Sequence, residues 1–231
     1  MGSFAYKIIG TSHVSKESKR KIELAVKEFK PDIICVELDR QRLQGLLQKS
    51  QGKEENEKIP LKLIFQIGFW GYLFSLLGRT VQNKIGKKLN IMPGEDMLSA
   101  VKLAGENNLP LALIDQDIKI TLQRLSKNFR FKDKWHFIVD FFRGLIMPKK
   151  VLKEMGFTTI DLSKIPSNKI IEKAILMMEK RYPGIYKAIV EDRNHYMVAK
   201  IKNILRKEPD KKLLIVVGAG HKKGMEELLK K

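Results

Sequence analysis

Cysteine is almost missing from this sequence of 231 residues, in which Cys35 stands alone. A single cysteine excludes an intramolecular disulfide framework and fits a reducing compartment. Residues 1–9 also lack the long apolar segment of a secretory signal peptide, so we expect no such signal here. Local metal motifs such as His-Glu-x-x-His are missing too, so any metal ligands would come from distant parts of the chain.

Acidic residues are few. The 26 Asp and Glu stand against 45 Lys and Arg, which gives a formal net charge of +19. Such an imbalance predicts an anionic partner, namely a membrane surface, a nucleic acid or an acidic substrate. The plainer alternative is that the charge only keeps the surface solvated. Because no RNP or zinc-finger signature accompanies the charge, a nucleic-acid partner is disfavoured. The length and the 43% of hydrophobic residues suit a globular protein with a sizeable core.

Histidine is also scarce, yet two of the four histidines close the same pattern. One apolar run precedes Gly10-Thr11-Ser12-His13, and another precedes Gly218-Ala219-Gly220-His221. A short apolar run that is stopped by glycine predicts a buried strand followed by a sharp turn. We therefore expect both histidines at the carboxyl ends of strands, which is the edge at which α/β sheets bind ligands.

Two further apolar runs end in carboxylates. One run closes with Glu37 and Asp39, and the other closes with Asp115 and Asp117. Helical periodicity between the runs predicts that neighbouring strands are parallel, so that their carboxyl ends share one edge. The sequence therefore predicts an α/β fold with imidazoles and carboxylates gathered at that edge.

Two imidazoles and a carboxylate form a sound ligand set for a divalent metal, and His13, Glu37 and His221 supply one. A metal with an open position can lower the pKa of its bound water and polarise a carbonyl group. This set suits zinc, manganese, cobalt or iron, and the sequence does not choose among them. A metal-free alternative uses one histidine as a general base that Glu37 orients.

Five consecutive polar residues, 191–195, interrupt a predicted helix whose flanks are apolar. Consecutive positions span more than one helix face, so some of these side chains should point inward. An inward Arg193 needs an anionic partner, because a buried unpaired charge is costly. The candidate partners are Glu37, Asp115 and Asp117.

Two stretches are unusually apolar. Residues 61–77 are near the lower length limit for a transmembrane helix, and three alternatives compete: a buried core helix or lid, a helix lying at a membrane interface, or a spanning helix. Residues 129–145 interleave aromatic with basic side chains, as in a surface that stacks on single-stranded nucleic acid. The helical spacing of Trp135, Ile138 and Phe142 instead favours a face packed against the protein.

The residues together resemble the TraB family, which includes bacterial pheromone-shutdown proteins and archaeal homologues. Wider relatives of that family are the Tiki metalloproteases, the erythromycin esterases and the haem-binding ChaN proteins. The resemblance covers nearly the whole chain. Its carriers are Gly10-Thr11-Ser12-His13, Val36-Glu37-Leu38-Asp39-Arg40, Pro93-Gly94-Glu95-Asp96-Met97, Ile114-Asp115-Gln116-Asp117-Ile118, Asp192-Arg193-Asn194 with Tyr196-Met197, and Gly218-Ala219-Gly220-His221.

The resemblance implies a central mixed, largely parallel sheet flanked by helices. It also implies two related halves, each with one strand and one Gly-x-x-His turn. Residues 1–231 would then form a single domain with an apolar helical insert at about 59–90 and 129–185. Family members usually carry membrane helices after the second Gly-x-x-His. We therefore expect the soluble domain of a membrane-associated protein, with those helices outside this chain.

The resemblance further implies a site and an activity. Its metal ligands would be His13, Glu37 and His221, and its catalytic residues would be Glu37, Glu95, Asp115, Arg193 and Asn194. Tiki-like relatives are manganese- or cobalt-dependent peptidases. We therefore expect a hydrolase that uses manganese, cobalt or zinc and cleaves a peptide at or near a membrane. The alternative is a non-catalytic module that sequesters a peptide or a haem-like ligand. We expect a membrane surface as one partner. An exposed apolar insert would also favour a homodimer that buries it.

Overall fold

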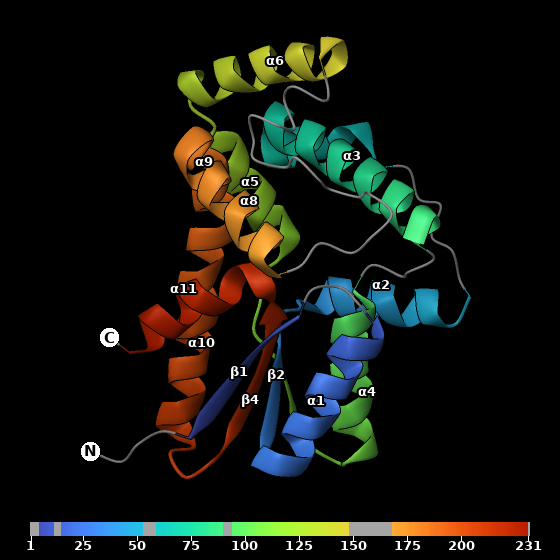
Figure 1. Ribbon diagram of the computed structural model, residues 1–231, viewed down its shortest axis with the longest axis vertical. Helices are drawn as coiled ribbons and strands as arrows, with labels where there is room; N and C mark the ends of the chain where they lie inside the picture. Colours follow the sequence, from blue (N-terminus) through green and yellow to red (C-terminus); the bar gives the residue numbers. More distant parts are fainter. Residues whose placement is uncertain (1–4, 12–14, 53–58, 90–93, 148–167, 231) are drawn as a thin grey trace.

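A computed structural model describes residues 5–11, 15–52, 59–89, 94–147 and 168–230 (Figure 1). Four strands form one sheet in the order β1-β4-β2-β3. Their bounds are Tyr6–Thr11 for β1, Ile33–Val36 for β2, Leu111–Leu113 for β3 and Leu213–Gly218 for β4. Every neighbouring pair is parallel, so the expectation of a mixed sheet is wrong for the described strands. The reason is that helices connect successive strands and return the chain to the same end of the sheet.

Strand β4 lies in the middle of the sheet. Its residue Ile215 stands opposite Ile8 of β1 and Cys35 of β2. All residues of β4 but the last are buried, which explains why its sequence is continuously apolar rather than alternating. Cys35 is fully buried, and burial raises the pKa of its thiol to about 12, so it remains a protonated core residue.

Helices cover both faces of the sheet (Figure 1). One face packs against α1 (Ser15–Phe29), α2 (Arg40–Ser50) and α4 (Glu95–Glu106), and the other packs against α10 (Asp192–Lys207) and α11 (Ala219–Leu229). Ile22 of α1 and Ala100 of α4 are fully buried on the first face, as are Met197 and Ile201 of α10 on the second. The sheet is therefore the middle of three layers.

Further helices lie beyond the carboxyl ends of the strands (Figure 1). They are the short η1 (Leu61–Leu63), α3 (Ile64–Leu89), α5 (Ile118–Asn128), α6 (Phe131–Ile146), α8 (Asn168–Arg181), α9 (Pro183–Tyr186) and the π-helix η2 (Lys187–Glu191), which leads into α10. An aromatic cluster holds them together around the buried Phe129, whose ring centroid lies 4.7 Å from that of Trp70 and 5.4 Å from that of Phe74. The expectation of a single domain over residues 1–231, with a helical insert at about 59–90 and 129–185, stays a prediction.

Helix α3 carries much of the apolar stretch and bends at Gly68, whose φ of 74° favours glycine. The segment Leu61–Thr80 is long and apolar enough to cross a membrane, and only 11% of it is buried. Phe65 is 93% exposed and Phe69 is 60% exposed, whereas Ile67 is 1% exposed, so the helix is buried on one face only and is not a core helix buried all round. The lid, the helix lying at a membrane interface and the spanning helix all stay predictions, because length and composition do not separate them.

Helix α6 contradicts one expectation. Trp135, Ile138 and Phe142 were expected to pack against the protein, but they are 60%, 43% and 56% exposed. The helix instead buries the opposite face, which carries most of its polar side chains. His136 lies on that face, and its Nδ1 donates to the Arg181 carbonyl oxygen over 3.1 Å.

Candidate functional site

Arg193 is the centre of a charged cluster at the carboxyl ends of the strands. Its Nη2 lies 2.5 Å from Oε1 of Glu37, the residue that follows β2. The same Nη2 lies 2.6 Å from Oδ2 of Asp115, two residues beyond β3, and Nε donates to Oδ1 of Asp115 over 3.1 Å. The prediction of an inward Arg193 is therefore confirmed, and of its candidate partners Glu37, Asp115 and Asp117 the guanidinium contacts the first two.

The helix before Arg193 explains its direction. The π-helix η2 takes one more residue per turn than an α-helix and so shifts the register of the residues that follow. Arg193 is the second residue of α10, and its Nη1 also donates to the Ile189 carbonyl oxygen over 3.2 Å. In this irregular turn Nη1 of Arg193 binds the backbone carbonyl of Ile189, while Nε and Nη2 reach the two carboxylates.

The cluster is buried and electrically balanced. The side chains of Arg193, Glu37 and Asp115 are 11%, 9% and 2% exposed. Burial by itself raises the pKa of Glu37, but the charges of His221 (in its protonated form, at acidic pH), Arg193 and Arg42 outweigh it and bring that pKa to about 2. Burial likewise lowers the pKa of Arg193, and the charge of Glu37 more than reverses this, so the guanidinium stays protonated. Glu37 is therefore ionised at neutral pH.

His221 is held as a neutral imidazole. Its Nε2 lies 2.9 Å from Nη1 of Arg193, and because a guanidinium can only donate, Nε2 must be the acceptor. The proton then sits on Nδ1, which donates to Oδ1 of Asn194 over 2.7 Å. Burial lowers the pKa of His221 in agreement with this tautomer. Asn194 is positioned by close contact with Gly224, where an added Cβ would come within 2.5 Å of Nδ2.

The junction of β4 and α11 completes the site. Gly218 is the last residue of β4 and the N-cap of α11, and its N–H donates to Oε2 of Glu37 over 2.7 Å. The positive end of the helix thereby stabilises the carboxylate. His221 lies in the first turn of α11, so the strand passes directly into a helix and brings His221 Nε2 to 3.4 Å from Glu37 Oε1.

Arg42 also belongs to the cluster, although it was not among the residues predicted from the sequence. Its Nη1 donates to Oδ2 of Asp115 over 2.9 Å, and its side chain is 38% exposed. The signal was present, because Asp39 is the N-cap of α2 and accepts the backbone N–H of Arg42. A residue three positions after an N-cap lies near the preceding strand end.

The remaining predicted residues lie elsewhere. Among the described residues no hydrogen bond or ion pair joins Glu95 to the cluster, and the buried carboxylate at the start of α4 is Asp96, which accepts from the Thr11 hydroxyl over 2.5 Å. Asp117 is the N-cap of α5. His13, and with it the first Gly-x-x-His turn, lies outside the described residues.

The cluster has two of the donor groups that a divalent metal needs. The donor types fit, since a carboxylate and the unprotonated Nε2 of a neutral imidazole lie 3.4 Å apart, in Glu37 and His221. The bond from His221 Nδ1 to Asn194 is also the kind of support that metal-bound histidines have. Arg193 now donates to Nε2, so it would have to release that atom. Within the described residues no group of three potential ligands comes together.

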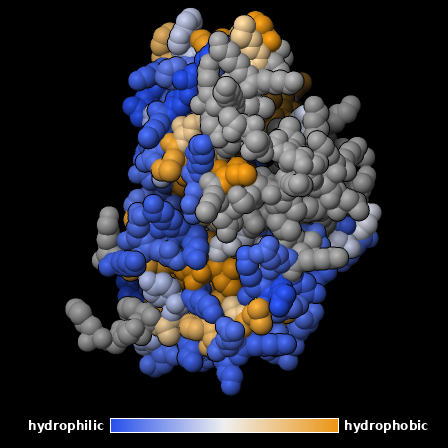
Figure 2. All heavy atoms as spheres, viewed as in Figure 1, coloured by the Kyte–Doolittle hydropathy of each residue, from blue (hydrophilic) through white to orange (hydrophobic). Residues whose placement is uncertain are grey.

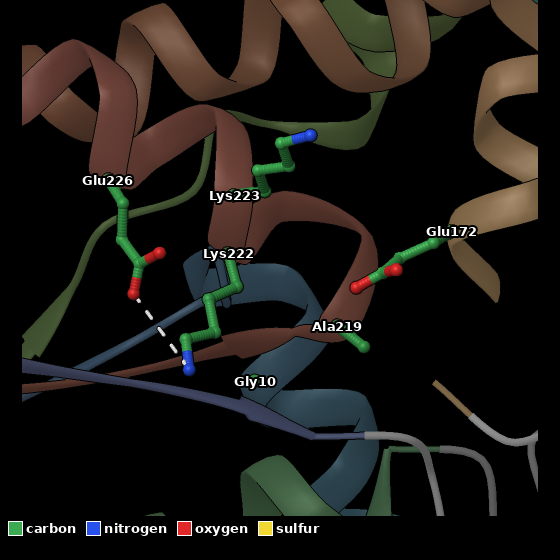
Figure 3. Close-up of a pocket in the computed structure, with 6 residues that line it drawn as sticks. All are labelled: Gly10, Glu172, Ala219, Lys222, Lys223 and Glu226. Atoms are coloured by element: carbon green, nitrogen blue, oxygen red, sulfur yellow. Dashed lines mark ion pairs between the residues drawn. The ribbon is translucent and has the colours of Figure 1, made fainter. Parts of the chain in front are cut away.

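A small pocket borders the site (Figure 3). It is lined by Gly10, Glu172, Ala219, Lys222, Lys223 and Glu226. Gly10 belongs to β1 and Ala219 follows the last residue of β4, so the pocket opens at the same edge of the sheet. Lys222 and Glu226 form an ion pair of 3.8 Å on α11. A polar, mixed-charge wall therefore stands next to the charged cluster.

A parallel α/β sheet with a buried charged cluster at its carboxyl edge defines the class of protein, one whose ligands are expected at that edge. Residues 5–231 match the TraB/PrgY/gumN family, and the chain belongs to that family. The resemblance found in the sequence is thereby confirmed across nearly the whole chain.

Several relatives share this full span. The chain is 33% identical over 229 residues to the uncharacterised protein MJ1365 of Methanocaldococcus jannaschii. That match covers 97% of this chain and 53% of the relative. It is 26% identical over 248 residues to the TraB domain-containing protein of Homo sapiens and 25% identical over 248 residues to that of Mus musculus. The last two matches cover 98% of this chain and 62% of each relative.

Proposed function

We propose that the chain is a metal-dependent hydrolase that cleaves a peptide at or near a membrane. The observation that carries the proposal is the state of His221, which Asn194 holds neutral with Nε2 3.4 Å from Oε1 of Glu37. A buried imidazole kept in this tautomer beside a carboxylate is prepared to ligate a divalent ion. Glu37 and His221 would hold manganese, cobalt or zinc, with His13 as the third predicted ligand.

The bound ion would supply an acidified water and a polarised carbonyl group. The residues of the chain would do the rest. Arg193, once its Nη1 leaves His221, can direct Nη1 to the carbonyl oxygen of a substrate, where negative charge develops. Because the guanidinium is planar and rigid, this turn would also shift the bonds of its Nε and Nη2 to Asp115. Asp115, which Arg42 also binds, would keep the guanidinium at the site. Asn194 keeps the proton on Nδ1 of His221 throughout.

A second function is favoured by a different observation, namely that the oxygens of both carboxylates are already engaged. Glu37 accepts from Arg193 and Gly218, and Asp115 accepts from Arg193 and Arg42. Neither carboxylate has an oxygen free of these partners with which to act as a general base. A module that binds a peptide or a haem-like ligand without turnover would need no such base.

Metal titration separates the two functions. Manganese, cobalt and zinc would be titrated into metal-stripped protein and into the variants His221→Ala, Glu37→Gln and His195→Ala. His195 is the matched control, because it is exposed on α10 beside Asn194. We expect binding that is lost in the first two variants and kept in the third, together with peptide cleavage in a library screen.

Two results would decide against the hydrolase. Metal binding that His221→Ala leaves unchanged would place the metal elsewhere. Tight binding of a peptide or haem without turnover, with each metal supplied in turn, would establish the sequestering module instead.

A further inference from the structure

Helix α6 turns most of its polar side chains inward. Beside the ring of Phe137, its inward face carries Asp133, His136 and Asp140, with the two aspartates 1% and 9% exposed. Arg181 pairs with Asp140 through Nε and Nη2, each at 2.5 Å, and the Tyr182 hydroxyl also donates to Asp140. Asp133 accepts the backbone N–H of Arg130 over 3.1 Å. These bonds anchor α6 through polar groups and leave its apolar face without a partner among the described residues.

The outward face of α6 is a continuous aromatic and aliphatic stripe. Its members recur at helical spacing and are Phe131 (82% exposed), Trp135 (60%), Ile138 (43%), Phe142 (56%) and Ile146 (74%). Figure 2 shows hydrophobic residues at the end of the molecule where Figure 1 places α6. Single exposed apolar residues are ordinary, but a stripe of this length on one helix marks an interaction surface.

The charges around the stripe are of one sign. The only acidic residues between positions 127 and 147 are Asp133 and Asp140, and both are turned inward. Lys127, Arg130 and Lys132 are exposed beside the stripe. An apolar face flanked by basic side chains on a helix is the pattern that lies in the interface of an anionic bilayer.

We propose that α6 docks this protein on an anionic lipid surface, with the stripe Phe131–Ile146 in the interface and the flanking lysines against the headgroups. A second copy of the chain fits this face less well. An isologous dimer would bring the same stripe from two copies together and would place their basic residues side by side. The proposal does not depend on the hydrolase function.

The aromatic cluster couples this surface to the site. Phe137 lies on the inner side of α6, and its ring centroid is 6.4 Å from that of Trp70 in α3 and 6.0 Å from that of Phe129 after α5. Helix α5 begins three residues after Asp115 of the charged cluster. A bilayer bound by α6 would therefore hold the site at a defined distance from the membrane.

Vesicle binding tests the proposal. The protein would be floated with vesicles of phosphatidylcholine and phosphatidylserine, and with vesicles of phosphatidylcholine alone. We expect binding to the anionic vesicles, weakened by about tenfold or more in Trp135→Ser/Phe142→Ser because the apolar area that enters the interface is lost. Lys127→Gln/Lys132→Gln should weaken binding to the anionic vesicles. Binding of this variant should also depend less on the salt concentration. Leu24→Ser/Leu47→Ser, which alters exposed apolar residues on α1 and α2, is the matched control and should bind normally.

Fluorescence locates the contact. The chain has two tryptophans, so a Trp70→Phe variant reports on Trp135 alone. Its emission should shift to the blue on anionic vesicles and be quenched by brominated lipids. Failure of the unaltered protein to bind anionic vesicles would overturn the proposal, as would binding that leaves Trp135 emission unchanged. A dimer that is lost in Trp135→Ser/Phe142→Ser, without vesicle binding, would identify the stripe as a protein interface instead.

Discussion

Nε2 of His221 accepts a hydrogen bond of 2.9 Å from Nη1 of Arg193. This one contact sets the protonation state of the imidazole and occupies the lone pair that a metal would need. The site therefore has two arrangements available to it: Arg193 on His221, or Arg193 turned to a substrate while His221 takes a ligand. Because Nε and Nη2 of the rigid guanidinium both bind Asp115, the second arrangement also requires those two bonds to shift.

Removing the guanidinium of Arg193 should lower the free energy of unfolding. In Arg193→Ala, the carboxylates of Glu37 and Asp115 lose their shared cation while remaining buried, which typically costs about 3–5 kcal/mol of unfolding free energy. Arg193→Lys should recover part of the loss, since it restores the charge but not the fork. Chemical denaturation measures both. Arg206→Ala, on the exposed end of the same helix, is the control, and an equal loss there would refute the assignment.

Asn194 is expected to matter for metal affinity more than for stability. Asn194→Ala removes the acceptor for His221 Nδ1, and loss of such a partner commonly lowers metal affinity by about 10–100-fold. The affinity for manganese, cobalt and zinc would be compared by titration with that of Asn203→Ala, an exposed asparagine on the same helix. Equal affinities in the two variants would show that Asn194 does not orient the imidazole.

Gly184 should tolerate no side chain. A Cβ at this position would overlap the Asn128 carbonyl oxygen and lie 2.5 Å from Oδ2 of Asp133. Gly184→Ala is therefore expected to cost about 1–3 kcal/mol, because backbone must move to admit the methyl group. Gly105→Ala has open space and sits in a helix, so it should stabilise by about 0.5–1 kcal/mol. Thermal denaturation of the two variants gives the sign of each change directly.

Acid should weaken the anchor of α6. Hydrogen bonds from Arg181 hold the pKa of Asp140 below its ordinary value, despite partial burial. A carboxylate whose pKa is lowered by folding adds stability above its unfolded pKa and loses it as the pH falls. The difference in unfolding free energy between the unaltered protein and Asp140→Asn should thus be largest near neutral pH and shrink below about pH 4. A difference that stays constant down to strongly acidic pH would contradict this account.

Much of the site was accessible from the sequence. The apolar runs that end at Glu37, Asp115 and Gly218 predicted strands whose carboxyl ends meet, and parallel pairing brings them together. Five polar residues in a row predicted an inward Arg193, because a helix cannot turn all of them to solvent. These inferences succeeded because they depend on local periodicity and on the cost of an unpaired buried charge.

What the sequence determined by itself is therefore the alternation of buried strands and helices, the edge where they end, and the charges gathered there. Only the tertiary structure decided which face of α6 is buried. Periodicity marked Trp135 and Phe142 as one face but could not say that Arg181 and Tyr182, some forty positions away, would pair with Asp140. The same holds at α4, where packing against Thr11 selected Asp96 rather than Glu95. Amphipathic spacing defines two faces of a helix, and partners distant in the chain decide which face turns inward.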